Sequence, residues 1–383
     1  MENNNFTDED KKFMNMALKL AEKGRGKTRP NPMVGTVIVK EGKRAATGYH
    51  QKAGGPHAEI EAISSAKMSL RGARMYVTLE PCTIYGRTPP CADEIIKQGF
   101  SEVIVASLDP NPKVYGQGIK KLKAAGIKVR SGLFKDRAAV QNEEFFKNMR
   151  TGMPLVTLKA AVSLDGKLAA SSGDSKWITS QPSRLMVQRL RKETGCVLTG
   201  IGTVEADNPF LFPRESLDSP VAAKHMVKNF SRVVLDPDLR IRPESNLAQT
   251  AQQVETIIVT ASGDKEKADC LRRQGLTITM MEPGSKRFNL KDVLGTLYSK
   301  HGITSILIEA GPGIGTAFLK EGQIDKFFVF VAPIILGQNR YSMFSDLGLE
   351  KVCQSYKLEF KRIKKIGEDL LITAYPRKKC LQE

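Results

Sequence analysis

Four residues in the first quarter of the chain have the types and spacing of a catalytic zinc site. His57, Cys82 and Cys91 offer one imidazole nitrogen and two thiolates, all good zinc ligands. Three protein ligands leave the fourth tetrahedral position open for water, as catalysis requires. Zinc lowers the pKa of a bound water towards neutrality, and Glu59 is close enough along the chain to accept the proton. The sequence therefore predicts hydrolytic chemistry here.

Each of these residues taken singly also has a structural interpretation. A lone histidine is often a satisfied core residue, and a lone cysteine is often a small buried side chain. Together, with Pro81 directly before Cys82, they match the division of labour in zinc-dependent nucleobase deaminases, where the glutamate is not a ligand. The common signature has two residues between the cysteines, whereas residues 83–90 separate them here.

The composition is that of an ordinary globular protein. The 383 residues are enough for two domains, and the apolar share of 41% is too high for a disordered chain. No run of about 18 apolar residues predicts a membrane span, and the N-terminal sequence lacks the apolar core of a signal peptide. Six scattered cysteines do not suggest a disulfide framework. We expect a cytoplasmic protein.

The net charge of +18 raises the question of nucleic-acid binding. Residues 1–150 carry 26 Lys/Arg against 16 Asp/Glu, and the remainder carries 33 against 25. The excess is therefore spread over both halves, whereas a nucleic-acid binder more often concentrates it in a basic stripe with aromatic residues. Two sites for phosphorylated small molecules fit the charge at least as well.

The first half alternates strands with helices. Thr7-Asp8-Glu9-Asp10 resembles a capping box, and it precedes a helix with one apolar face. Asn31 lies at the start of a predicted strand, where its amide could bind a pyrimidine edge or simply belong to a turn. The alternation predicts a layered α/β domain with a mostly parallel sheet. We expect strands at 34–39, 47–50, 75–79, 103–106 and 127–129, and helices from His57, from Cys91 and over 118–125.

A short linker, 150–154, separates the two halves, and the pattern of strands and helices begins again after it. The sequence therefore predicts two domains, 1–150 and 151–383. Lys159 lies among apolar residues of a strand over 155–161, where it either meets a counter-charge or ligand phosphate, or extends to water from an edge strand. Glycine-rich exits at 200–203 and 311–315 could bring backbone amides to a pyrophosphate, although glycines alone are a weak signal. We expect further strands at 197–199, 233–235, 256–260, 305–308 and 369–375, helices at 182–191 and 316–320, and a loop from Asp207 to Arg214.

The sequence between the two cysteines resembles one particular family. Cys-Thr-Ile-Tyr-Gly-Arg-Thr-Pro-Pro-Cys, with Asn-Pro-Met-Val-Gly before it and Asp-Pro-Asn-Pro after it, is similar to the bifunctional riboflavin-biosynthesis deaminase/reductase family. The resemblance implies a cytidine-deaminase-like three-layer α/β domain with zinc on His57, Cys82 and Cys91 and Glu59 as proton carrier. It departs from the pattern at Ile84, where the family usually has a substrate-contacting histidine. The implied substrate contacts are Asn31, His50, Arg87 and Asn111.

The second half resembles the reductase domain of the same family. Its order of motifs, Lys-Ala-Ala, Ser-Leu-Asp-Gly-Lys, Trp-Ile-Thr, Gly-Ile-Gly-Thr and the glycine loop after Glu309, implies a dihydrofolate-reductase-like α/β domain that takes NADPH. Asp207 or Lys159 would assist proton transfer. The implied NADPH contacts are Ala161, Trp177, Thr203, Gly311, Pro312, Gly313, Ile314 and Gly315. The implied substrate contacts are Ser175, Arg191, Asp207, Arg214 and Glu309.

The resemblance implies two consecutive reactions on a phosphorylated pyrimidine. Zinc-dependent hydrolysis removes the 2-amino group of 2,5-diamino-6-(ribosylamino)pyrimidinone 5′-phosphate, and NADPH then reduces the ribosyl side chain to ribityl. We expect no nucleic-acid or membrane partner, and the family suggests a homo-oligomer that pairs through its reductase domains. Two alternatives stay open: a zinc deaminase acting on nucleic acid with a C-terminal binding module, and a homologue, motivated by Ile84, in which only the reductase is active.

Overall fold

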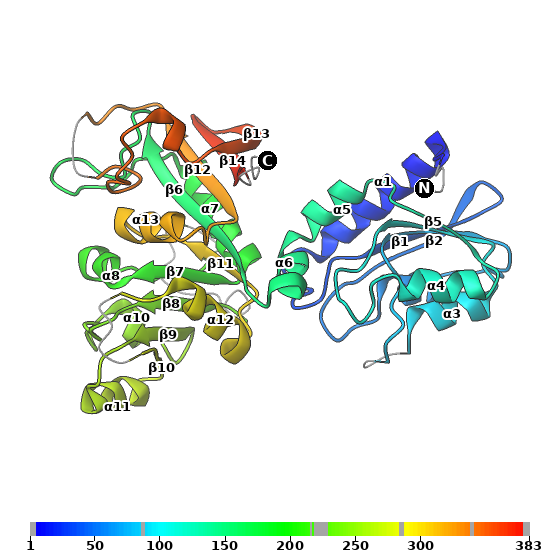
Figure 1. Ribbon diagram of the computed structural model, residues 1–383, viewed down its shortest axis with the longest axis horizontal. Coiled ribbons are helices and arrows are strands. Elements are labelled where there is room, and N and C mark those ends of the chain that lie inside the picture. Colours follow the sequence, from blue (N-terminus) through cyan, green and yellow to red (C-terminus); the bar gives the residue numbers. More distant parts are fainter. Residues whose placement is uncertain are drawn as a thin grey trace. The chain divides into compact units, whose positions relative to one another are not determined.

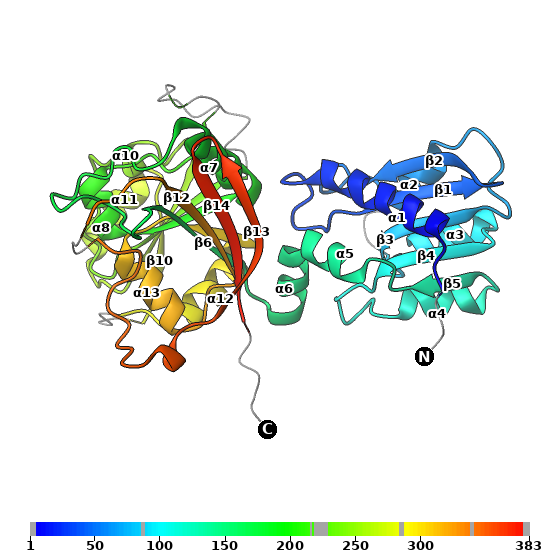
Figure 2. The ribbon, with the colours of Figure 1, turned by 90° about the horizontal axis from the view of Figure 1, so that it is seen from above.

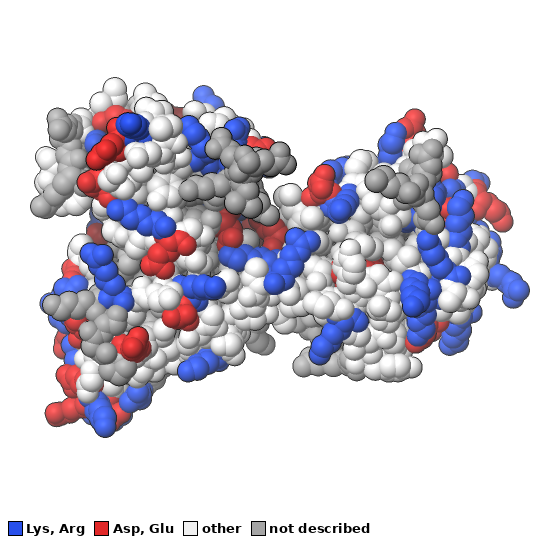
Figure 3. Space-filling model, in the orientation of Figure 1, with Lys and Arg blue, Asp and Glu red and all other residues white. Residues whose placement is uncertain are grey.

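The computed structural model describes residues 5–85, 89–214, 217, 229–282, 287–337 and 341–377. The chain divides into two compact units, Met1–Met153 and Pro154–Glu383 (Figures 1 and 2). Among the described residues, none of the helices is both long and apolar enough to cross a bilayer. Lysine and arginine side chains are scattered over the visible face of each unit and are interspersed with acidic ones (Figure 3).

The first unit contains one five-stranded sheet in the order β2-β1-β3-β4-β5. β1 runs antiparallel to both of its neighbours, whereas β3, β4 and β5 are parallel. The strands are β1 (Gly35–Lys40), β2 (Lys43–Tyr49), β3 (Arg74–Leu79), β4 (Glu102–Ser107) and β5 (Lys128–Ser131). The helices are α1 (Asp8–Ala21), α2 (Ala58–Ser64), α3 (Cys91–Gln98), α4 (Gln117–Ala124), α5 (Lys135–Gln141) and α6 (Glu143–Thr151), with a 3₁₀ turn at Glu22–Gly24.

Helices cover both faces of this sheet and give the unit three layers (Figure 1). α1 and α5 enclose one apolar cluster, which includes Met14 and Tyr76, while α2, α3 and α4 enclose the other, which includes Ile95 and Leu122. The predicted capping box begins α1: Thr7 accepts from the Asp10 N–H, and Asp10 accepts from the Thr7 N–H. Alternating strands and amphipathic helices therefore produce the predicted layered architecture.

The second unit contains a nine-stranded sheet in the order β10-β9-β8-β7-β11-β6-β12-β14-β13. The strands from β10 to β12 in this order are parallel to one another. β14 is antiparallel to both of its neighbours, β12 and β13. The strands are β6 (Leu155–Ser163), β7 (Cys196–Gly200), β8 (Ser231–Leu235), β9 (Glu255–Thr260), β10 (Thr277–Met280), β11 (Ser305–Ile308), β12 (Lys326–Ala332), β13 (Leu358–Ile366) and β14 (Asp369–Pro376).

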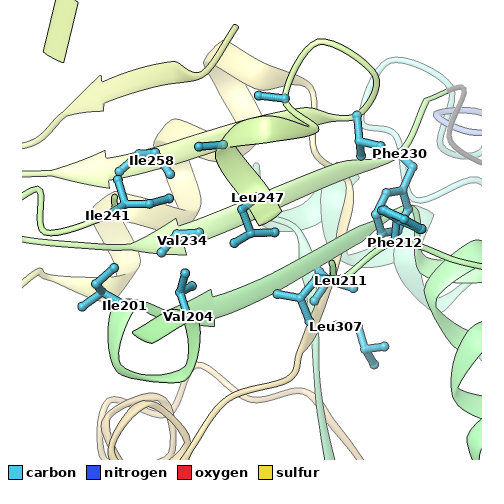
Figure 4. Close-up of a cluster of buried hydrophobic side chains, with 14 of the residues drawn as sticks. Ile201, Val204, Leu211, Phe212, Phe230, Val234, Ile241, Leu247, Ile258 and Leu307 are labelled. Atoms are coloured by element: carbon cyan, nitrogen blue, oxygen red, sulfur yellow. The ribbon is translucent and has the colours of Figure 1, made fainter. Parts of the chain in front are cut away.

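Helices cover both faces of this sheet as well (Figure 2). α7, α10 and α11 pack on one face, where Val234, Leu247 and Leu307 belong to one apolar cluster (Figure 4). α12 and α13 lie on the opposite side. The helices are α7 (Gln181–Thr194), α8 (Ile201–Asp207), α10 (Asn246–Gln249), α11 (Lys265–Arg273), α12 (Leu290–His301) and α13 (Pro312–Lys320), with a 3₁₀ turn at Val352–Gln354.

The predicted strands and helices are present, but two local predictions are wrong. Residues 201–207 form α8, so Asp207 ends a helix and does not belong to a loop. The glycine loop is shorter than predicted because α13 begins at Pro312, a residue that favours the first helical turn. Of the two interpretations of Lys159, the edge strand is excluded, since β6 lies between β11 and β12. The sequence prediction also missed β10, β12 and β13.

Candidate active sites

The three predicted zinc ligands meet at the ends of three elements. His57 directly precedes α2, Cys82 follows β3, and Cys91 is the first residue of α3. Their ligand atoms all lie within 4.8 Å of one another. His57 Nδ1 is 3.2 Å from Cys91 Sγ and 3.5 Å from Cys82 Sγ.

These separations fit a tetrahedral zinc ion. Zn–S and Zn–N bonds of ordinary length place neighbouring ligand atoms about 3.5 Å apart. The Cys91 N–H donates to Cys82 Sγ over 3.4 Å and helps to orient that ligand. Hydrogen bonds from Cys91 and His57 lower the pKa of the Cys82 thiol well below its ordinary value despite its burial. Cys82 is therefore suited to bind zinc as a thiolate.

Glu59 lies in the first turn of α2, two residues after His57, and is only 3% exposed. α2 can approach β2 closely because Gly48 has no side chain: a Cβ there would lie 2.3 Å from Ala58 O. Burial raises the pKa of Glu59 to about 7, and the negative Cys82 sulfur adds to this effect. A carboxyl group with such a pKa can both take and give a proton near neutral pH.

Asn31 and His50 form a chain of contacts that leads to this cluster. His50 Nδ1 lies 2.9 Å from Pro56 O and therefore donates to it, which leaves Nε2 to accept from Asn31 Nδ2 at 3.1 Å. The His50 and His57 rings meet edge to face with centroids 5.7 Å apart. Burial lowers the pKa of His50, so its neutral form is favoured. The Asn31 amide is thereby oriented, with its oxygen left to accept from a ligand.

A buried carboxylate, Glu80, holds the neighbouring loop in place. It accepts hydrogen bonds from the backbone N–H groups of Asp109, Gly116, Gly118 and Ile119, at 2.9–3.2 Å. Asn111 belongs to this loop, and its Oδ1 accepts from the Lys113 N–H. Sequence reasoning assigned no role to Glu80, although its place directly before Pro81-Cys82 was visible. Ile84 is 41% exposed; Arg87 lies outside the described residues.

The second unit contains a cavity of about 840 Å³ at the carboxyl ends of β6, β7 and β11. This is large enough for a cofactor together with a small substrate. Of the residues predicted for the reductase site, only Gly315 does not line the cavity; it faces Leu158 and Phe344 instead. The lining includes Lys159, Ala161, Ser175, Trp177, Arg191, Thr203, Asp207, Arg214, Glu309, Gly311, Pro312, Gly313 and Ile314.

A buried ion-pair group lies in this cavity. Glu309 Oε2 is 3.0 Å from Lys159 Nζ, and the Arg191 guanidinium binds both Glu309 oxygens at 2.6 and 3.1 Å. Burial alone would raise the pKa of Glu309, but the charges of Arg191 and Lys159 outweigh it and hold the pKa at about 2. Lys159 therefore meets a counter-charge, as one of its two interpretations predicted.

Arg214 lies against two aromatic rings beside this group. Its guanidinium carbon is 5.5 Å from the Phe210 ring centroid and 5.6 Å from that of Phe212. Its backbone N–H donates to Gln188 Oε1. Burial and then the nearby Arg191 charge lower the pKa of Arg214. Two guanidinium groups close enough to repel each other favour an anion between them, such as a phosphate.

Three glycines open another part of the cavity wall. A Cβ placed on Gly202, Gly311 or Gly313 would meet no atom within 4 Å, so the backbone faces open space there. Gly311 N–H also donates to Thr203 Oγ1 at 3.3 Å, which joins the start of α8 to the start of α13. Exposed backbone amides at a helix start suit the phosphates of a dinucleotide.

Sequence reasoning missed several polar residues of the cavity wall, among them Arg184, Gln188 and Tyr341. Arg184 stacks on Trp177 at 4.4 Å and donates to Thr179 O. The first two share a helix face with Arg191, and this i, i+4, i+7 spacing on α7 was a signal in the sequence. Tyr341 comes from a segment far along the chain, which no local pattern links to the cavity.

Two family models match the chain. The model of the cytidine and deoxycytidylate deaminase zinc-binding region matches residues 7–107, which contain the His/Cys cluster and Glu59. The model of the RibD C-terminal domain matches residues 154–372, which contain the large cavity. The folds and sites thus define a two-domain enzyme, a zinc-binding deaminase followed by an α/β reductase.

Relatives match over nearly the whole chain. The riboflavin biosynthesis protein RibD of Aquifex aeolicus is 44% identical over 365 residues, which are 95% of this chain and 97% of that protein. RibD of Escherichia coli strain K12 is 41% identical over 369 residues, or 95% and 98% of the two chains. The chain therefore belongs to the RibD family, the bifunctional deaminases and reductases of riboflavin biosynthesis.

Solved structures agree with this assignment. RibD of Acinetobacter baumannii, form 1, has a TM-score of 0.85 at 39% identity and covers 97% of this chain and 99% of its own. A diaminohydroxyphosphoribosylaminopyrimidine deaminase/5-amino-6-(5-phosphoribosylamino)uracil reductase of Thermotoga maritima has a TM-score of 0.82 at 33% identity, with 96% and 99% covered. A nucleic-acid deaminase with a binding module is not favoured, because the second unit matches a reductase domain.

Proposed function

We propose that the first unit deaminates 2,5-diamino-6-(ribosylamino)pyrimidinone 5′-phosphate and that the second reduces the ribosyl side chain of the product with NADPH. The observation that carries the proposal is the pairing of a His/Cys/Cys cluster and a buried Glu59 in one unit with a cavity that holds Lys159, Glu309 and two arginines in the other. The Thermotoga maritima relative is described by the same two activities.

In the deamination, His57, Cys82 and Cys91 would hold zinc, which supplies Lewis-acid activation of the attacking water. Glu59 takes one proton from that water and delivers it to the departing amino group, so that water adds an oxygen to the ring carbon and ammonia leaves. The amide of Asn31, oriented by His50, would hold the polar edge of the pyrimidine. Asn111 and Arg87 are proposed as further substrate contacts.

In the reduction, NADPH would supply a hydride to C1′ of the opened, imine-like sugar; the C1′–N double bond would become single, and the nitrogen would take one proton. We assign that proton to Lys159, because its ammonium group lies in the cavity next to Glu309, whereas Asp207 is exposed at the end of α8. Arg191 and Arg214 would hold the phosphate, with Ser175 and Glu309 as further substrate contacts. Ala161, Trp177, Thr203 and residues 311–314 would hold the cofactor.

The test is a coupled assay on the zinc-loaded enzyme with the diaminopyrimidine phosphate and NADPH. We expect one ammonia released and one NADPH oxidised per substrate. Cys82→Ser should abolish ammonia release yet still oxidise NADPH when the deaminated compound is supplied, and Lys159→Met should do the reverse. Ammonia release without NADPH oxidation by the wild-type enzyme would contradict the reductase assignment, and NADPH oxidation only with the deaminated compound would contradict the deaminase assignment.

We further propose that the partners are small molecules rather than nucleic acid, that the enzyme is cytoplasmic, and that it pairs through the reductase units. The distributed surface charge and the sparse cysteines support the first two proposals. The edge strand β13 supports the third, since Phe360 and Ile363 on it are 63% and 56% exposed.

A further inference from the structure

A fully buried arginine, Arg232, lies in the apolar core of the second unit. It lies on β8, an interior strand between β9 and β7, and its exposure is 0%. It shares a face of β8 with Val234, which belongs to the apolar cluster of Figure 4, so an apolar residue would be expected at its place. Its pKa is lowered by burial to about 9. An arginine so deeply buried is rare and requires partners for its five N–H groups.

Those partners are hydroxyl and carbonyl oxygens; no carboxylate is within salt-bridge distance in the described part of the chain. Nε and one terminal nitrogen donate to Thr256 Oγ1, at 3.0 and 2.6 Å. The same terminal nitrogen reaches Leu247 O and Val254 O, at 3.1 and 3.2 Å. The other terminal nitrogen donates to Thr250 Oγ1 and to Phe210 O, at 2.8 and 2.9 Å. The guanidinium thus joins β8, α10, β9 and the segment 208–214.

The segment 208–214 forms one wall of the reductase cavity, through Pro209, Leu211 and Arg214. Besides Arg232, helices α10 and α7 hold this segment. Asn246 N–H and Nδ2 donate to Asn208 at 2.8 and 2.6 Å. Arg191 donates to Phe212 O at 3.3 Å, and the Arg214 N–H donates to Gln188 Oε1 at 3.1 Å. Leu211 has a φ of +51°, a conformation that an L-residue keeps only when its surroundings hold it. The wall therefore depends on fixed anchor points.

A series of contacts leads from Arg232 to Arg214, the proposed phosphate ligand. Phe210, whose carbonyl Arg232 binds, packs its ring against that of Phe212 with centroids 5.4 Å apart. The Arg214 guanidinium lies over both rings. Fixing the Phe210 backbone thus fixes the platform that directs Arg214 towards the anion site beside Arg191.

We propose that Arg232 is a positioning residue for substrate recognition by the reductase, acting through Phe210 on Arg214. This inference rests on the proposed function, in which Arg214 binds the substrate phosphate. It explains why an arginine is kept where an apolar residue would pack: one planar group with five donors can tie four chain segments together, which neither a lysine nor a hydrophobic side chain can do.

The test is the steady-state kinetics of Arg232→Lys in the full-length enzyme with the deaminated substrate and NADPH. We expect the KM for the pyrimidine phosphate to rise about tenfold or more, while kcat and the KM for NADPH change less than about threefold. Arg214→Lys should raise the same KM. In the double variant, Arg232→Lys with Arg214→Lys, the two increases in KM should not multiply, because each substitution disrupts the same placement of the Arg214 guanidinium.

Arg240→Lys is the matched control, since Arg240 follows the same strand but pairs with Glu205 at the surface, and it should leave all constants unchanged. Hydrogen exchange in peptides of β8 and β9 reports on folding of the second unit, and ammonia release by the first unit reports the amount of enzyme. If Arg232→Lys does not fold, Thr250→Val removes one acceptor of the guanidinium instead and should raise the pyrimidine KM about threefold.

Two results would overturn the inference. A lower kcat with both KM values unchanged would mean that the substitution merely reduces the folded fraction. Increases in KM that multiply in the double variant would mean that Arg232 does not act through Arg214. Failure of the proposed function is recognised separately, because the wild-type enzyme would then not oxidise NADPH with the deaminated substrate at all.

Discussion

At the scale of single residues, the deaminase site depends on one buried carboxyl group that is not a metal ligand. Glu59 occupies the first turn of α2, where burial raises the pKa of its carboxyl group and favours uptake of a proton during the hydrolysis. Replacing it by glutamine keeps the shape of the side chain but removes the carboxyl group that takes up and returns the proton. We therefore expect Glu59→Gln to lower ammonia release by at least about 100-fold.

The controls for Glu59→Gln are the zinc content and the second activity. Zinc should stay at about one per chain, because His57, Cys82 and Cys91 are unchanged. NADPH oxidation with the deaminated substrate should also be unchanged. Residual ammonia release close to that of the wild type would exclude Glu59 as the proton carrier.

The reductase site depends on Glu309, a buried carboxylate whose pKa is lowered, whereas that of Glu59 is raised. With its pKa near 2, Glu309 cannot serve as a proton donor at neutral pH, and its charge instead orders Lys159 and Arg191. Glu309→Gln leaves these two cations without a counter-charge. We expect NADPH oxidation to fall about 100-fold and the second unit to lose roughly 3 kcal/mol of stability.

Glu205→Gln is a suitable comparison for Glu309→Gln. Glu205 pairs with Arg240 at an exposed position, so its loss should cost less than about 1 kcal/mol and leave the rate unchanged. Wild-type kinetics in Glu309→Gln would contradict the role of the ion-pair group. Thermal unfolding and NADPH oxidation, measured on the same preparations, separate lost stability from lost catalysis.

At the scale of elements, helix α1 is fixed to the first sheet through Asp10. Its side chain is fully buried and binds Tyr76 of β3 and Arg130 of β5, at 2.8 and 2.9 Å. Burial would raise its pKa, but Arg130, the Thr7 N–H and Tyr76 outweigh this and hold the pKa at about 2, below the ordinary value of 3.8. Such a group stabilises the folded state above about pH 4 and loses this effect as the pH falls towards 2.

We therefore expect Asp10→Asn to destabilise the first unit by roughly 2 kcal/mol at pH 7 and by much less near pH 2. The measurement is urea unfolding at several pH values, followed by hydrogen exchange in peptides of β3 and β5. Peptides of the second unit are the internal control. A difference that does not shrink on acidification would show that the lost stability comes from packing and not from the charge.

Helix α4, which follows the loop that carries Asn111, packs its first turn against the zinc-binding loop at Gly118. A Cβ at this position would lie 2.1 Å from Pro81 O, directly before the ligand Cys82. Gly118→Ala must therefore displace Cys82 or break the hydrogen bonds of Glu80 to this loop. We expect zinc affinity to fall about tenfold or more, measured by competition with a chelator.

Gly126→Ala provides the contrast for Gly118→Ala. Gly126 has a φ of +81°, so alanine strains the backbone there, but its Cβ would meet no atom within 4 Å. This variant should lose about 1 kcal/mol of stability and keep its zinc. Equal zinc loss in both variants would point to general destabilisation.

The sequence was most informative where a few residues define chemistry or a helix end. The zinc ligands, Glu59 and the capping box at Thr7 could be predicted because their residue types and order along the chain are characteristic. The partner of Lys159 could not be predicted, since Glu309 meets Lys159 only after β6 and β11 pair. Arg191 reaches the same carboxylate from α7. The helix 201–207 was missed because glycines at its start favour a loop by local propensity, and tertiary packing overrides this.

At the scale of the whole molecule, the described residues of each candidate site come from one unit. The zinc ligands and Glu59 lie within Met1–Met153, and all residues lining the large cavity lie within Pro154–Glu383. Each unit also has its own sheet and apolar clusters. We therefore expect the two reactions to be separable in the intact chain, and treatment with a zinc chelator should abolish ammonia release without slowing reduction of the deaminated substrate.

The same argument predicts complementation between two defective enzymes. Cys82→Ser lacks a zinc ligand but keeps the reductase cavity, and Lys159→Met lacks the proposed proton donor but keeps the zinc site. Neither alone should couple the diaminopyrimidine phosphate to NADPH oxidation. An equimolar mixture should do so, after a lag in which the deaminated compound accumulates in solution. If each variant performs its own half-reaction but the mixture oxidises no NADPH, the intermediate does not pass through solution and the two sites cannot be separated in this way.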